Sequence, residues 1–208
     1  MGVKIFIEGG GVGGATMKTF RSKCQMFFDK MLVGRDKLKI TPGGGRSQTL
    51  ALFLASLKSL GKSDYSILLV DAEGPLAPDA DKWDHILATI TSNAKKPKDL
   101  ETEDLHFMVQ IMESWFLADP HELSSYYGSA FRAEKLPKPI NGLDIETHLK
   151  DVVLKKLSAA VKPCQTDGYA KSDGWDLIAL IDPAEVCKVS HFARELRKRL
   201  LTLLPERE

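Results

Sequence analysis

The sequence predicts an α/β fold, in which a Rossmann-like parallel sheet flanked by helices is followed by a mainly helical C-terminal extension. Short apolar runs alternate with longer amphipathic segments through the first half of the chain. The run at residues 65–74 is almost wholly apolar before its acids, as in a strand buried on both faces of a parallel sheet. We expect an α/β domain over residues 1–135 and a helical extension packed on it over 136–208.

The first two elements follow from periodicity. Residues 3–8 ("VKIFIE") are predicted to form a buried strand. Residues 15–32 are predicted to form an amphipathic helix, because their apolar residues recur at helical spacing. The stripe consists of Phe20, Cys24, Phe27, Phe28 and Met31.

The same alternation continues to the middle of the chain. A second strand is expected at residues 37–41 and ends at Pro42, before three glycines. Residues 46–60 repeat the helical period, and residues 65–74 supply the third strand. Residues 105–119 are predicted to open as a fourth strand and continue as a helix. Further helices are predicted at residues 83–90, 120–127, 145–160, 175–180 and 191–204.

Composition limits the function classes. Lys and Arg (29) nearly balance Asp and Glu (28), so the chain has no overall basic field for nucleic acid. Basic runs at residues 94–98, 132–138 and 194–199 are interpreted as solvated faces. The three cysteines are distant from one another, which argues against a disulfide framework or zinc cluster and favours a cytoplasmic location. No apolar run is long enough to span a membrane.

A glycine-rich turn follows the first strand and resembles two nucleotide-binding patterns. A dinucleotide site needs an acid near the end of the second strand, where this chain has Thr41 and Pro42. A Walker A loop needs Lys before its Ser or Thr, but Ala15 precedes Thr16. Glu8 would also face the bound phosphates. We therefore reject both nucleotide-binding interpretations.

Acidic residues stand at the ends of two predicted strands. Glu8 ends the first, and Asp71 and Glu73 end the third. The carboxyl ends of parallel strands share one edge of a sheet, so these acids could converge. Clustered carboxylates suit Mg²⁺ or Mn²⁺. The alternative for each acid alone is a turn or helix cap.

These residues resemble a known family. "IEG" at the end of the first strand and "VDAEG" at the end of the third look like the Toprim domain of topoisomerases, DnaG-type primases and OLD-family nucleases. "MESWFLAD" together with "GGGR" is similar to small bacterial Toprim-like proteins encoded beside ABC- or SMC-type ATPases in anti-phage loci, for which the PARIS effector is a comparable case. The resemblance covers residues 3–119, and is weaker at 167–183.

The resemblance implies a metal-dependent nuclease that hydrolyses DNA or tRNA under the control of an ATPase partner. Glu8 would bind metal or act as general acid or base, and Asp71 and Glu73 would hold one or two Mg²⁺. The family pattern has Asp where this chain has Glu73, and the longer side chain of Glu is expected to shift the metal or reduce activity.

Other candidates come from neighbouring segments. Glu113 lies in an apolar segment, where an acid needs either the metal site or an ion-pair partner. Gly44 and Arg46 could hold a substrate phosphate or form a plain turn, and Lys171 could also meet phosphate. Two further acids, Asp119 and Asp182, each precede a proline and are predicted to cap helices.

Two hypotheses remain. The chain is either a nuclease or a non-catalytic subunit that binds a nucleotide or a partner protein. The discriminating feature is whether Glu8, Asp71 and Glu73 approach within reach of one ion. Capping of Glu8 by backbone would favour the second hypothesis.

Overall fold

The computed structural model describes residues 2–11, 13–59, 61, 64–90, 96, 104–138 and 144–207. Its centre is a parallel sheet of four strands in the order β2-β1-β3-β4, which confirms the predicted α/β fold. The strands are β1 (Gly2–Ile7), β2 (Lys39–Pro42), β3 (Asp64–Asp71) and β4 (Leu105–Met108).

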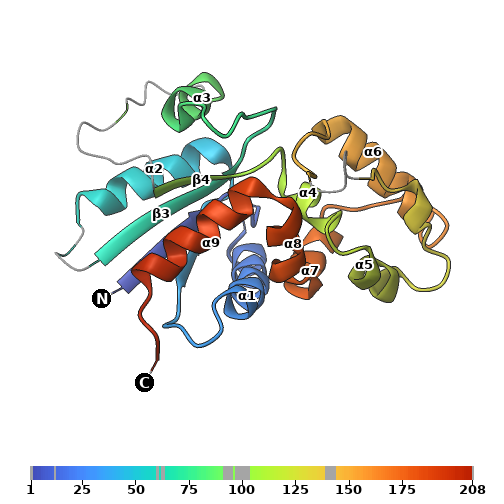
Figure 1. The fold of residues 1–208 in the computed structure, drawn as a ribbon, viewed down its shortest axis with the longest axis horizontal. Coiled ribbons are helices and arrows are strands. Elements are labelled where there is room, and N and C mark those ends of the chain that lie inside the picture. Colours follow the sequence, from blue (N-terminus) through green and yellow to red (C-terminus); the bar gives the residue numbers. More distant parts are fainter. Residues whose placement is uncertain are drawn as a thin grey trace.

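Helices cover both faces of the sheet (Figure 1). On one face, α2 (Arg46–Leu57) and α3 (Lys82–Ala88) bury apolar side chains against the alternate residues of β1 and β3. On the other face, α1 (Gly14–Met31) and α9 (His191–Leu203) pack over the remaining residues of these strands. The predicted stripe of α1 is confirmed, because its buried residues are Phe20, Cys24, Phe27, Phe28 and Met31.

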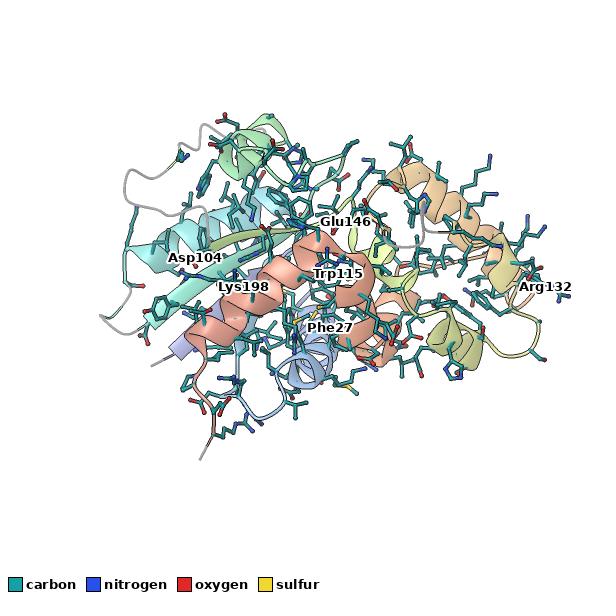
Figure 2. The ribbon with its side chains drawn as sticks, in the orientation of Figure 1. Phe27, Asp104, Trp115, Arg132, Glu146 and Lys198 are labelled. Carbon is teal, nitrogen blue, oxygen red and sulfur yellow. The ribbon has the colours of Figure 1, made fainter. Side chains whose placement is uncertain are left out.

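The remaining helices lie beyond the carboxyl edge of the sheet (Figure 1). One buried apolar cluster runs from the sheet into these helices, and Phe27 of α1 stacks on Trp115 with ring centroids 5.4 Å apart (Figure 2). The division at residue 135 stays a prediction. The elements are α4 (Met112–Phe116), α5 (Pro120–Tyr127), the short 3₁₀ helix η2 (Ala133–Lys135), α6 (Lys150–Val161), α7 (Asp173–Leu180) and α8 (Pro183–Val189).

Several boundaries differ from the sequence prediction. Pro42 belongs to β2, which is an edge strand, where a missing backbone donor is tolerated. α6 begins at Lys150 rather than at residue 145, because the preceding segment turns back to contact α9. The sequence predicted Asp182 as a helix cap but did not predict the extent of α8, the helix that follows it. Leu60, all of the basic run 94–98 except residue 96, and residues 139–142 lie outside the described part of the chain.

None of the described helices is long and apolar enough to cross a bilayer.

Candidate functional site

Glu8 and Asp71 lie side by side at the carboxyl edge of the sheet. β1 and β3 are adjacent and in register, and the Glu8 backbone N–H continues their ladder by donating to the Leu69 carbonyl (3.0 Å). The Asp71 backbone N–H in turn donates to Glu8 Oε2 (3.2 Å). The strand-end acids therefore meet as the parallel topology requires, and the Glu8 carboxylate is partly capped by backbone.

The glycine-rich turn has a structural function. Gly9 and Gly44 exchange two backbone hydrogen bonds (2.8 and 3.0 Å), which join the loops after β1 and β2. Gly9 has φ of 127°, and a Cβ there would lie 2.7 Å from the Phe20 ring. The Gly44 N–H donates to the Gly9 carbonyl and is therefore not free to bind a substrate phosphate. The predicted phosphate contact at Gly44 is wrong.

Arg46, the first residue of α2, occupies the centre of the site. Its Nε lies 3.2 Å from Glu8 Oε2, and its Nη2 donates to the Asp71 carbonyl at 2.6 Å. The same Nη2 lies 3.5 Å from Glu73 Oε1. With 10% of its side chain exposed, Arg46 is a largely buried counter-ion for two carboxylates.

Glu73 does not continue β3 as an extended residue. The strand ends at Asp71, and Glu73 has φ of 62°, so the prediction of a third strand that extends through Glu73 to residue 74 is wrong. A non-glycine residue in this left-handed region is uncommon and is stabilised here by neighbours. Its N–H donates to the Gln110 carbonyl (2.8 Å), and its carboxylate Oε2 lies 2.6 Å from Lys150 Nζ.

Lys150 and Gln110 were missed by sequence reasoning. Lys150 opens α6, and its backbone N–H donates to the side-chain Oε1 of Gln110 (3.0 Å). Gln110 is buried, and its Nε2 has no hydrogen-bond partner among the described residues. Only tertiary packing brings α6 to the sheet edge, so no local pattern in the sequence could have identified Lys150.

Glu113 is buried in α4 and is satisfied by a tyrosine rather than by the ion pair that was one alternative. The Tyr169 hydroxyl donates to Glu113 Oε1 (3.0 Å). Lys171, the predicted phosphate contact in this segment, is exposed and makes no ion pair with the acids among the described residues. Residues 167–183 therefore contact the site through the Tyr169 hydroxyl rather than through Lys171.

The predicted helix caps are confirmed. Asp119 Oδ1 accepts from the Glu122 N–H at the start of α5 (3.2 Å). Asp182 Oδ1 accepts from the Ala184 N–H at the start of α8 (2.8 Å). These acids are structural and lie outside the candidate site.

Burial and mutual repulsion make the carboxyl groups at the sheet edge harder to ionise. Burial raises the pKa of Asp71 well above its usual range, and the charges of Glu8, Glu113 and Glu73 raise it further. A hydrogen bond from the Met112 N–H (2.9 Å) opposes this rise. Burial also raises the pKa of Glu8, although Arg46 lowers it.

The donor chemistry fits a hard divalent cation, but the side-chain arrangement does not form a coordination shell. Within the described ranges, no three His, Cys, Asp or Glu residues are placed to hold a metal. Arg46 contacts both Glu8 and Glu73. A cation bound by these carboxylates would have to replace part of the Arg46 interaction.

A family model described as a domain of unknown function (DUF4276) matches residues 12–201. The chain belongs to this family. The DUF4276 match begins just after Glu8 and includes Arg46, Asp71, Glu73 and Glu113. No curated protein and no solved structure matches the chain.

Proposed function

We propose that this DUF4276 protein is a divalent-metal-dependent nuclease that hydrolyses phosphodiester bonds of DNA or tRNA. The observation that carries the proposal is the acidic sheet edge, where the pKa values of Glu8 and Asp71 are raised despite the presence of Arg46. Such a site gains from one further cation. Glu8, Asp71 and Glu73 would hold Mg²⁺ or Mn²⁺.

When bound, the cation would polarise the phosphate and lower the pKa of a bound water. The chain supplies the remaining positive charge through Arg46 and Lys150, which both contact Glu73. Substrate phosphate would compete with Glu73 for these two side chains and free this carboxylate.

Partner and location belong to the same proposal. The resemblance to Toprim-like proteins supports an ABC- or SMC-type ATPase that controls an anti-phage effector. The three cysteines are free thiols, which supports a cytoplasmic location.

A second function, a non-catalytic subunit that binds a nucleotide or a partner protein, is favoured by a different observation. Glu8 is already satisfied by Arg46 and by the Asp71 backbone N–H. In that case, the ion pairs would be structural, and divalent cations would not change the stability of the protein.

The test is cleavage of plasmid DNA and bulk tRNA in Mg²⁺ and in Mn²⁺, by the protein alone and with the adjacent ATPase. Glu8→Gln and Asp71→Asn should each abolish cleavage. The matched control is Asp176→Asn, which removes a partly exposed acid that contacts Lys23 and Tyr126 outside the site. No cleavage and no metal-induced rise in Tm under any condition would support the second function. Cleavage that survives in Asp71→Asn would contradict the assignment of the catalytic site to the sheet edge.

A further inference from the structure

A groove lies between the C-terminal end of α1 and helices α8 and α9. It encloses about 730 Å³ and shares no residue with the acidic site. Lys198, on the exposed side of α9, belongs to its wall (Figure 2). The groove is lined by Lys30, Met31, Pro183, Ala184, Cys187, Lys188, Arg194, Arg197, Lys198, Leu201 and Thr202.

The wall of this groove is strongly basic. It includes five cations and no carboxylate, in a chain whose net charge is only +1. A second cavity of about 610 Å³ shares Lys30 and Arg197 and adds Arg35 and Arg207. Its one acid, Glu206, pairs with Arg35. Arg207 in turn lies 4.0 Å from Asp36, so the charge that this second cavity adds is largely neutralised within the chain.

Part of this charge is neutralised within the chain, because Lys188 pairs with Glu185 (2.5 Å) and the carboxylates of Asp182, Glu122 and Asp119 act on Lys30. Lys30 Nζ donates to the carbonyls of Leu180 and Ile181 (2.7 Å each), and Arg194 Nη1 likewise donates to backbone carbonyls. For Arg194, the carbonyl groups position the cation without cancelling its charge. Arg197 and Lys198 are exposed and make no ion pair with any described residue. The groove therefore favours an anionic occupant.

The floor of the groove identifies the class of that occupant. It is aliphatic, formed by Met31, Pro183, Ala184 and Leu201 beside Cys187, and none of the lining residues is aromatic. Single-stranded nucleic acid binds on aromatic stacking platforms, which this surface lacks. An aliphatic floor instead stabilises an apolar side chain.

We infer that this groove binds an acidic segment of a partner protein, in which carboxylates flank one or two aliphatic side chains. Arg194, Arg197, Lys198 and Leu201 recur at helical spacing, so one face of α9 presents both the charge and the apolar contact. This face comes from the basic run at residues 194–199, for which a solvated face was the sequence interpretation. The inference does not depend on the nuclease proposal.

The experiment is a titration of the ¹⁵N-labelled protein, followed by backbone amide chemical shifts. The probe is a short peptide of aspartates and glutamates around a central pair of leucines. It is compared with the same peptide carrying serines and with a single-stranded oligonucleotide of equal charge. The leucine peptide should shift the amides of Met31, Cys187 and Leu201, the serine peptide should bind more weakly, and the oligonucleotide should leave these amides unchanged.

Charge-reversal variants distinguish binding in this groove from nonspecific electrostatic attraction between the peptide and the protein. Arg197→Glu with Lys198→Glu should weaken binding of the leucine peptide at least about tenfold. Lys155→Glu with Lys156→Glu, a matched pair of exposed lysines on α6, should leave binding unchanged. Dispersed spectra establish that both variants are folded. Equal weakening in both variants, absence of peptide-induced shifts, or displacement of the peptide by the oligonucleotide would overturn the inference.

Discussion

Arg46 holds together a group of carboxylates that would otherwise repel one another. It binds Glu8 and Glu73 through its side chain and fixes the end of β3 through the Asp71 carbonyl. A guanidinium can do this because its donors point in several fixed directions. The same position makes Arg46 the competitor of any divalent cation, so Arg46 and a metal provide alternative means of neutralising the edge.

Asp71→Asn tests whether the edge carries uncompensated charge. The asparagine Oδ1 can still accept from the Met112 N–H, while the unfavourable carboxylate charge is removed. We expect Tm measured in EDTA to rise, by about 2–4 °C for each kcal/mol gained, and the Mg²⁺-induced rise in Tm to disappear. Asp176→Asn should change neither quantity. A lower Tm for Asp71→Asn in EDTA would mean that Arg46 compensates Asp71 fully.

At the scale of elements, Glu146 connects the segment before α6 to the start of α9. Its carboxylate accepts from the backbone N–H groups of His191 and Phe192 (3.1 and 3.0 Å) and from the Ser190 hydroxyl. Ser190 also caps the helix by accepting from the Ala193 N–H. The side chain lies at the junction of these elements in Figure 2. An acid beside the first turn also interacts favourably with the helix dipole.

Glu146→Ala should destabilise the protein because it leaves the α9 donors without their acceptor. We expect a loss of about 1–3 kcal/mol, measured as a lower midpoint of denaturant unfolding. Glu146→Gln retains one acceptor oxygen and should lose less. Glu134→Ala, an exposed acid on η2, serves as the control and should have little effect. If Glu146→Ala unfolded like wild type, this distant cap would contribute nothing to stability.

Elements with a strong local period could be predicted from the sequence, and those fixed by distant contacts could not. The stripe of α1 and the apolar run of β3 are local signals, and both are confirmed. The start of α6 could not be predicted, because the segment before it is held by a contact between Glu146 and α9. No pattern in the neighbouring sequence indicates this contact. The same reasoning applies to the site, where strand ends indicate Glu8 and Asp71 but not Lys150 or Tyr169.

At the scale of the whole molecule, a net charge of +1 conceals two regions of opposite sign. Four carboxylates gather at the sheet edge around Arg46, and five cations line the groove beside α9. The composition alone indicated a chain with no overall field that would attract a charged ligand. The fold instead separates the charges, so acidic residues predominate in one region and basic residues in the other.

The acidic region should make stability depend on pH and on divalent cations together. A carboxyl group whose pKa is higher in the folded chain contributes stability below its unfolded pKa, and this contribution is lost as pH rises through the folded value. The pKa values of Glu8 and Asp71 are raised from 4.5 and 3.8, so Tm in EDTA should fall as pH rises above this range. Because ionised carboxylates bind cations, the rise in Tm caused by Mg²⁺ should grow over the same pH range.

Melting curves across this pH range, with EDTA or Mg²⁺, measure both effects. Other acids titrate as well, including Glu146, whose pKa is raised by burial. The informative quantity is therefore the difference between wild type and the double variant Glu8→Gln with Asp71→Asn, in which Glu146 is unchanged. The variant should lose the pH dependence of the Mg²⁺ effect. An Mg²⁺ effect that is the same at every pH, or that persists in the variant, would place any bound cation away from the sheet edge.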